Sequence, residues 1–333
     1  MINLLWGFLF SFLLGCILAP IIIKLIKKLK AKQTILHYVE AHKQKQGTPT
    51  LGGLIFLLCT TITFFIFSNG QAKIAIVALA VFLSYGLLGF LDDFIKVKTH
   101  KNLGLRAYQK IIGQVGIAVL IAWFVYENQF MGGTLLLPWG FTMVDIGWVM
   151  IPFVIFTFLA MTNSANLTDG LDGLAGGVSF VSLIGFSIII LLTKDYFISM
   201  GFGVEYAEEM NNLALLGACA GGGVLAFLCF NSYPAKIFMG DTGSLALGGL
   251  ICALAVFCGQ MMFLLIICIM FVVSAVSVCL QVGYYKLTKK RIFLMAPLHH
   301  HFEQKGVNET KIVAIYIVIT IIATVFAIAL CLI

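Results

Sequence analysis

The sequence has 333 residues, of which 61% are hydrophobic and only 11% are charged, with a formal net charge of +7. A soluble domain carries roughly 25% charged residues, and one soluble core cannot enclose so many apolar residues, so the composition excludes an ordinary soluble protein. A membrane span needs about 20 apolar residues. The chain therefore has room for about ten spans with short loops, and we predict that residues 1–333 form one transmembrane domain.

The first apolar run, Leu4–Ile23, has no basic residue before it and is followed by Lys24, Lys27, Lys28 and Lys30. A cleaved signal peptide starts with positive charge and ends in small residues. This run therefore predicts a retained helix whose N-terminus lies on the outer side of the membrane.

Windows of about 19 residues predict the remaining spans. Residues 242–285 form one apolar stretch, interrupted only by Gly259-Gln260. Because this stretch is twice as long as one span, we divide it at that point. The ten predicted spans are 3–26, 51–68, 73–95, 109–126, 147–164, 173–192, 211–230, 242–259, 260–285 and 311–333.

The positive charges indicate how these spans are oriented. With the N-terminus outside, 19 of the 21 Lys and Arg residues fall on the inner side, and only Lys73 and Lys194 fall outside, in agreement with the positive-inside rule. Both termini are then outside, and a small hairpin is predicted at the outer face near 131–146. A basic inner face suits anionic lipid and anionic substrates, whereas no soluble basic module is present to bind nucleic acid.

The nine cysteines all lie in apolar runs and form no CxxC or Cys/His cluster. We therefore expect buried thiols rather than disulfides or zinc ligands. The candidates for metal binding are carboxylates. Five aspartates stand at the inner ends of hydrophobic helices, where a carboxylate is costly unless it is paired, hydrated or bound to metal; they are Asp92, Asp93, Asp169, Asp172 and Asp241.

Asp92 and Asp93 close the third predicted span. Adjacent helical residues point about 100° apart, so the two carboxylates cannot serve one point equally. Lys96 is four residues beyond Asp92 and can pair with it. A simple ion pair at a helix end is the alternative to a role in chemistry.

Polar residues recur every three positions after the fifth span, at Asn163, Asn166, Asp169 and Asp172. On a helix this spacing places them along one stripe. Helix capping is the alternative, although a cap needs one such residue rather than four.

Asn231 opens a loop shaped by Pro and Gly that leads to Asp241-Thr-Gly-Ser244. This run can cap the eighth span, and Asp is also the hard oxygen ligand that Mg²⁺ selects. Asp241 is therefore the candidate metal ligand, because four other inner aspartates accompany it.

Two basic segments complete the inner face. Lys45 precedes Gly47-Thr-Pro-Thr50 at the start of the second span, where backbone N–H groups and a lysine can hold phosphate; a plain positive flank is the alternative. His299, His300 and His301 follow Pro297. Zinc is one interpretation of the three histidines, but helical zinc ligands usually stand at i and i+4, so we favour contacts with phosphate or substrate.

Taken together, these segments resemble the polyprenyl-phosphate N-acetylhexosamine-1-phosphate transferases. The resemblance rests on Gly47–Gly53, Asn163–Gly173 and Phe238–Ser244, in family order and on one side of the membrane. Within the family, Pro297–Glu303 is typical of the branch whose donor is UDP-N-acetylmuramoyl-pentapeptide.

The resemblance implies that phospho-N-acetylmuramoyl-pentapeptide is transferred from UDP-MurNAc-pentapeptide to undecaprenyl phosphate, which gives lipid I and UMP. It also implies ten spans, both termini in the periplasm, an active site facing the cytoplasm, Mg²⁺ held by Asp241, and a homodimer in the bacterial inner membrane. A sister transferase that uses UDP-GlcNAc and a secondary transporter are the alternatives.

The resemblance also assigns roles to residues. The catalytic candidates are Asp92, Asp93, Asp241 and His299. The substrate-binding candidates are Lys45, Thr50, Asn163, Asn166, Asp169, Asp172, Asn231, Phe238, His300 and His301. Direct transfer is favoured over a phospho-enzyme, with Asp92 ahead of Asp93, and both questions stay open at the level of sequence.

Overall fold

The computed structural model describes residues 2–28, 47–99, 104–138, 142–199 and 201–332. In these ranges nine helices are long and apolar enough to cross a membrane, which confirms the predicted all-α polytopic membrane class. They are α1 (Ile2–Lys28), α3 (Lys73–Thr99), α4 (Ala107–Glu127), α5 (Met150–Thr168), α6 (Leu174–Ser199), α7 (Val204–Asn231), α8 (Gly240–Phe257), α10 (Ile269–Thr288) and α12 (Glu309–Leu330). The remaining predicted span corresponds to α2 (Gly53–Phe67), which is apolar but has only 15 residues.

The long apolar stretch is divided where the sequence predicts. Helix α8 ends at Phe257, and Gly259 has a φ of 76°, a left-handed conformation that suits glycine. The second half is interrupted again at Cys268, which the sequence analysis did not predict. It consists of η3 (Met261–Phe263), α9 (Leu264–Ile267) and α10.

The predicted spans 173–192 and 211–230 are too short at the ends that face each other, because helix α6 continues to Ser199 and α7 starts at Val204. Two acidic residues of the segment between these spans, Glu208 and Glu209, are not left in solvent. They instead accept hydrogen bonds from backbone N–H groups, with Glu208 bonded to Gln71 and Glu209 to Lys73.

The predicted hairpin near 131–146 is confirmed. Strand β1 (Thr134–Leu136) pairs antiparallel with β2 (Met143–Asp145), and Thr134 lies opposite Asp145. The short helix η2 (Gly147–Val149) leads from it into α5.

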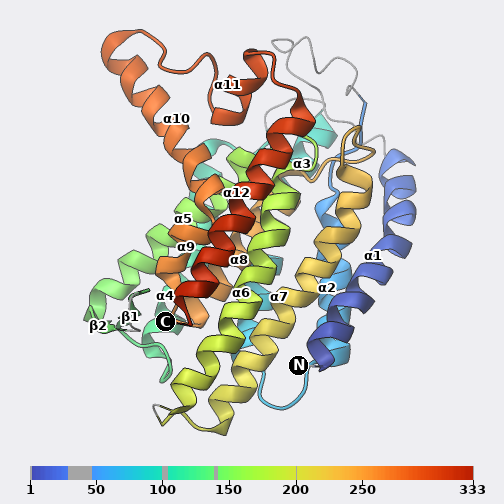
Figure 1. The fold of residues 1–333 in the computed structure, drawn as a ribbon. Helices are drawn as coiled ribbons and strands as arrows, with labels where there is room; N and C mark the ends of the chain where they lie inside the picture. The colour runs from blue at the N-terminus through green and yellow to red at the C-terminus, as the bar shows by residue number, and fades with distance from the viewer. Residues whose placement is uncertain (1, 29–46, 100–103, 139–141, 200, 333) are drawn as a thin grey trace.

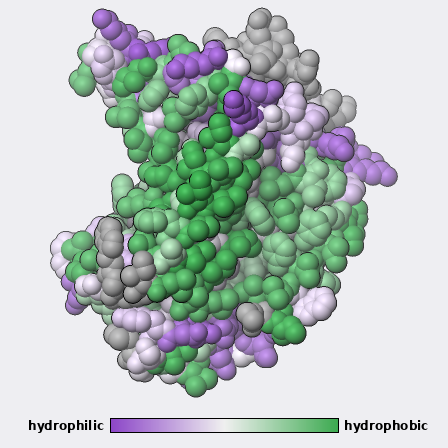
Figure 2. Space-filling view, viewed as in Figure 1, coloured by the Kyte–Doolittle hydropathy of each residue, from purple (hydrophilic) through white to green (hydrophobic). Residues whose placement is uncertain are grey.

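Helices α6, α7 and α8 form the interior of the bundle, and nearly every residue of α8 is buried. Helix α3 packs along α8, while α1 and α6 pack along α7. The surface shows an apolar band between two polar ends (Figure 2), which is the pattern of a protein embedded in lipid.

The two ends of the bundle carry different features. The chain termini lie in the lower half of Figure 1, whereas the end of α10 and the short helix α11 (Leu298–Gln304) lie at the top. The top end also receives the last turns of α3 and α5 and the first turn of α8, so it gathers the inner aspartates predicted from the sequence.

Candidate active site

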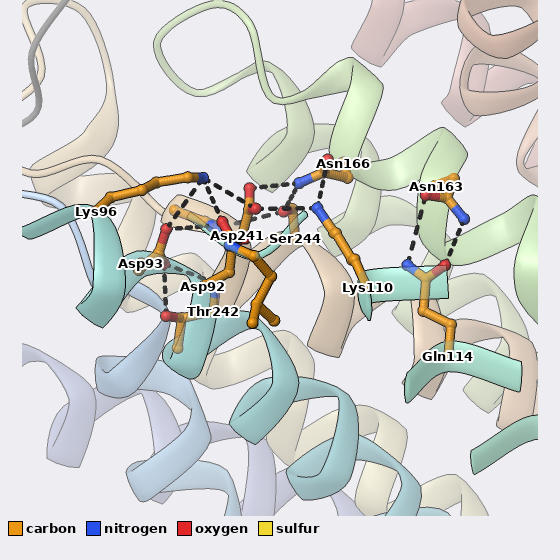
Figure 3. A network of polar contacts seen from close by, with 12 residues as sticks. Asp92, Asp93, Lys96, Lys110, Gln114, Asn163, Asn166, Asp241, Thr242 and Ser244 are labelled. Carbon is orange, nitrogen blue, oxygen red and sulfur yellow. Dashed lines mark hydrogen bonds and ion pairs between the residues drawn. The ribbon is translucent and has the colours of Figure 1, made fainter. Parts of the chain in front are cut away.

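Asp241 lies in the first turn of α8, at the centre of a polar network (Figure 3). Its Oδ2 is 2.9 Å from Nζ of Lys110 and 3.1 Å from Nζ of Lys96. Its Oδ1 accepts a hydrogen bond of 2.8 Å from Nδ2 of Asn166. Three different helices, α3, α4 and α5, therefore supply partners to this one carboxylate.

Helix α3 approaches the start of α8 very closely at Gly89. A Cβ at this position would overlap the backbone carbonyl of Asp241, so only glycine fits between the two helices. Asp92 and Asp93 follow one turn later on α3. The close approach at Gly89 is therefore what brings their carboxylates beside Asp241.

Asp93 caps helix α8 from outside. It is 3% exposed, and its carboxylate accepts hydrogen bonds from the backbone N–H of Thr242 at 2.9 Å, the Thr242 hydroxyl at 2.6 Å and the backbone N–H of Asp241 at 3.2 Å. A helix start leaves several N–H groups without partners and carries a partial positive charge. The carboxylate of Asp93 accepts hydrogen bonds from these N–H groups and supplies the opposite charge. It thereby fixes the first turn of α8, which carries Asp241. The sequence had suggested that Asp241-Thr-Gly-Ser244 caps α8 itself, but the cap comes from α3.

Asp92 faces the other way, as expected for a neighbouring helical residue. One carboxylate oxygen forms an ion pair with Lys96, which confirms the predicted i,i+4 pair, and the other accepts a 2.8 Å hydrogen bond from the backbone N–H of Leu105. Ligand oxygens of Asp92, Asp93 and Asp241 nevertheless lie within 4.8 Å of one another. Three carboxylates thus surround one point.

This donor set fits a divalent cation. If all groups are ionised, the three carboxylates carry more charge than Lys96 and Lys110 neutralise, and clustered carboxylate oxygens are the ligands of Mg²⁺ rather than of softer metals. The acidic cluster could therefore hold a metal ion, with Asp241 the most widely connected of its members.

The turn after α5 does not continue the predicted stripe. The helix ends at Thr168 and Asp169 is its C-cap, so only Asn163 and Asn166 share a helical face. Asp169 is half-buried among other acids, and its pKa is raised to about 8 by burial and by the charges of nearby carboxylates. The backbone leaves the helical conformation at Asp169, with a ψ of 55°, and Gly173, with a φ of 80°, makes the turn directly before α6.

Asp172 is buried, and its hydrogen bonds join the turn after α5 to two other segments of the chain. Its carboxylate accepts a 3.0 Å hydrogen bond from the backbone N–H of Ala235, and its own N–H donates to Glu309 at the start of α12. Asn231 accepts from the backbone N–H of Gly173 and donates to the carbonyl of Ile237. These bonds fasten the turn to its neighbours.

The three histidines on α11 do not converge on one point, because successive residues of a helix diverge. His299 is fully buried, and a Cβ on Gly170 would overlap its Nε2, so the α5–α6 turn lies directly against it. Burial, followed by the neighbouring His300, lowers the pKa of His299 to about 3. His300 contacts Glu303 at 2.9 Å, and Nδ1 of His301 accepts from the backbone N–H of Leu294.

Comparison with known proteins identifies the family. The model of glycosyl transferase family 4 matches residues 74–259, which include the three clustered aspartates. A phospho-N-acetylmuramoyl-pentapeptide-transferase of Desulfitobacterium hafniense is 44% identical over 92% of this chain and 91% of its own length. The chain belongs to this family. Enzymes with the same name from Clostridium perfringens and Clostridioides difficile are 42% and 40% identical, each over 94% of this chain and 93% of their own length.

The remaining predicted residues of this transferase lie around the cluster or outside the described ranges. Lys45 is outside them. Thr50 is buried near Asp93, because a Cβ on Gly240 would meet both side chains. Phe238 is bonded through its backbone to Pro49 and Gly52, which joins the start of α2 to the loop before α8.

Sequence reasoning missed several residues of the transferase site. Lys110 looked like an ordinary positive flank of the fourth span, yet it binds Asp241 directly. Ser244 accepts from Asn166, and Thr242 donates to Asp93. A polar residue at the sixth position of the predicted span 109–126 was the available signal for Gln114, which pairs with Asn163 one helical turn from Lys110 and Asn166.

Proposed function

We propose that the site formed by Asp92, Asp93 and Asp241 transfers phospho-N-acetylmuramoyl-pentapeptide from UDP-MurNAc-pentapeptide to undecaprenyl phosphate. The printed name of the relatives gives the transferred group, phospho-N-acetylmuramoyl-pentapeptide, and its transfer to undecaprenyl phosphate gives lipid I and UMP. The observation that carries this proposal is the gathering of three carboxylates and two lysines at one end of an otherwise apolar bundle. Such a site can receive a lipid phosphate from the membrane and a nucleotide from the adjoining solution.

In the proposed reaction an oxygen of the lipid phosphate attacks the β-phosphorus of the donor. The bond from that phosphorus to the bridging oxygen of the nucleotide breaks, and UMP leaves with the electron pair. The second pKa of a phosphate monoester is near 6, so the acceptor is mostly dianionic at neutral pH and needs little help from a base. Bringing two anions together is the main difficulty, and charge neutralisation is the main task of the site.

The contacts of the two adjacent aspartates support direct transfer. Both oxygens of Asp93 are engaged by the first turn of α8, so its carboxylate holds the helix rather than attacking phosphorus. Asp92 has one oxygen on Leu105 and the other on Lys96. Because the partly exposed side chain of Lys96 can turn away, whereas the first turn of α8 cannot, Asp92 is the better placed to take a proton from the acceptor. Lys96 and Lys110 are free to turn toward phosphate oxygens once a cation neutralises the carboxylates.

Asp241 would hold Mg²⁺, with Asp92 and Asp93 beside it. The ion would neutralise pyrophosphate oxygens of the donor and polarise the phosphorus. Asn166 from α5, Asp169 from the turn that follows it and His300 from α11 would contact the nucleotide or sugar. His299 lies buried against the same turn, and Lys45 would contact phosphate.

The proposed orientation places this end in the cytoplasm. Lys27 and Lys28 end α1, Lys96 and Lys98 end α3, and Lys286 ends α10, which the positive-inside rule assigns to the inner side. The termini and the hairpin would then face the periplasm of a bacterial inner membrane. A homodimer is the expected assembly.

The test is donor-dependent UMP release. Purified protein in detergent is incubated with undecaprenyl phosphate, Mg²⁺ and either UDP-MurNAc-pentapeptide or UDP-GlcNAc. We expect release only from the muramoyl donor, and none with EDTA. Release from UDP-GlcNAc alone would assign the protein to the sister transferases, and no release from folded protein would contradict the proposal. A burst of UMP without acceptor would replace direct transfer by a phospho-enzyme.

A further inference from the structure

A pair of side-chain amides, from α4 and α5, lies beside the acidic cluster at the right of Figure 3, one helical turn along each helix from Lys110 and Asn166. Nδ2 of Asn163 donates to Oε1 of Gln114 at 2.9 Å, and Nε2 of Gln114 donates back to Oδ1 of Asn163 at 3.4 Å. Gln114 is fully buried. Asn163 is partly buried, so each amide satisfies the other at a site where Gln114 has no access to water.

The amide pair is held from two further sides. Nδ2 of Asn163 also donates to the carbonyl of Leu159 at 2.8 Å, which keeps this side chain against its own helix. The hydroxyl of Tyr85, on α3, donates to the backbone carbonyl of Gln114 at 3.3 Å, and its ring stacks on Phe158 of α5 with the ring centroids 6.1 Å apart. The pair therefore belongs to a packed layer that joins α3, α4 and α5.

This layer is in register with the residues that contact Asp241. Lys110 stands one turn before Gln114 on α4, and Asn166 stands one turn after Asn163 on α5. Lys110 and Asn166 bind opposite oxygens of Asp241 and contact each other at 3.3 Å. A shift or rotation of α4 against α5 would move both partners of Asp241 at once.

We infer that Gln114 and Asn163 are positioning residues that fix Lys110 and Asn166 around Asp241 and so set the affinity of the acidic cluster for its divalent cation. This inference rests on the proposed function for the metal. It also reassigns Asn163, which the sequence had suggested as a substrate contact. Residues that orient metal ligands typically change metal affinity or activity by 10- to 100-fold when they are removed.

The test compares Gln114→Leu, Asn163→Leu and the double variant in purified, detergent-solubilised protein. Mn²⁺ serves as the probe, and its binding is measured by the loss of the free-ion EPR signal, without substrates. We expect each single variant to bind Mn²⁺ about tenfold or more weakly. The double variant should be no weaker than the worse single variant, because the same contact is lost. In the activity assay, the Mg²⁺ concentration for half-maximal UMP release should rise in parallel.

Gln260→Leu is the matched control, since Gln260 is also fully buried but lies between α8 and η3 at the other end of the bundle. It should bind Mn²⁺ like wild type. The exchanged pair, Gln114→Asn with Asn163→Gln, should recover part of the affinity.

Wild-type Mn²⁺ affinity in folded Gln114→Leu would overturn the inference. The inference would also be overturned if Gln260→Leu lost as much Mn²⁺ affinity as Gln114→Leu and if this loss followed the fraction of unfolded protein. The role of Gln114 would then be only structural. If wild type itself bound no Mn²⁺, the proposed metal site would fail first, which separates the two claims.

Discussion

Helix α3 meets buried carboxylates at both of its ends, and the two arrangements differ. At its start, Glu209 of α7 is 4% exposed and accepts hydrogen bonds from the backbone N–H groups of Lys73 at 3.0 Å and Ile74 at 2.8 Å. At its end, Asp92 and Asp93 meet Asp241 within 4.8 Å. At one end a single carboxylate is neutralised by the partial positive charge of a helix start. At the other end three carboxylates are clustered.

The comparison distinguishes a carboxylate that only stabilises the fold from carboxylates that can bind a cation. Each oxygen of Glu209 has a backbone partner, and the helix start supplies the opposite partial charge, so the group has no need of a ligand. The cluster contains more negative charge than its two lysines neutralise, which favours a cation. Asp93 combines both roles, because it caps α8 while it lies inside the cluster.

The largest effect is expected for Asp241→Asn. The substitution keeps the shape of the side chain but removes the charge that Lys96, Lys110 and the metal share, so UMP release should fall by at least about 100-fold with little change in thermal unfolding. Asp195→Asn, at an exposed carboxylate on the opposite end, should leave the rate unchanged. A rate within tenfold of wild type would remove Asp241 from the centre of the mechanism.

Glu209→Gln should show the reverse behaviour. Lys73 and Ile74 donate to different oxygens of Glu209, and in Gln one of these oxygens becomes an NH2 group that can only donate. One N–H is then left buried without a partner, at a cost of about 2–3 kcal/mol in the free energy of unfolding. The midpoint of thermal unfolding should drop, while the turnover of folded protein stays near wild type. The exposed neighbour Glu205 provides the control in Glu205→Gln. Loss of turnover without loss of stability would mean that this end also serves the reaction.

A pH series tests the buried histidine at the site end. The folded pKa of His299 is about 3 and the unfolded value is about 6.5, so between these values the unfolded chain binds more protons and stability rises with pH. Lowering the pH from 7.5 to 5 should therefore reduce the free energy of unfolding by about 2 kcal/mol. His299→Gln should flatten this dependence. An unchanged slope in the variant would show that folding does not lower the pKa of His299.

The smallest effect is expected for Thr242→Val. The variant removes the hydroxyl that donates to Asp93 at 2.6 Å but keeps the two backbone donors. We expect about a fivefold lower kcat, equivalent to about 1 kcal/mol. Thr193→Val, at a buried threonine of α6 whose hydroxyl bonds Ile189, is the control. A loss as large as that of Asp241→Asn would mean that the hydroxyl acts on substrate.

The elements that followed from local pattern were predicted well. Apolar length gave the spans, and the division at Gly259-Gln260 followed from length and charge alone. The aspartates at helix ends were visible because a carboxylate beside an apolar run is conspicuous in any window. The facing ends of α6 and α7 were missed for the same reason, since acidic residues that bond to another loop look like solvated ones in a sequence window.

What the sequence determined by itself was the membrane class, the number of apolar helices, the hairpin and the set of polar residues from which the site is built. Tertiary structure alone decided which of them meet. Close packing at Gly89 brings α3 onto α8, Lys110 arrives from α4, and Asp172 is directed to Ala235 instead. The physical reason is range: hydropathy and helical period act over a few residues, whereas the cluster depends on contacts between helices that are far apart along the chain.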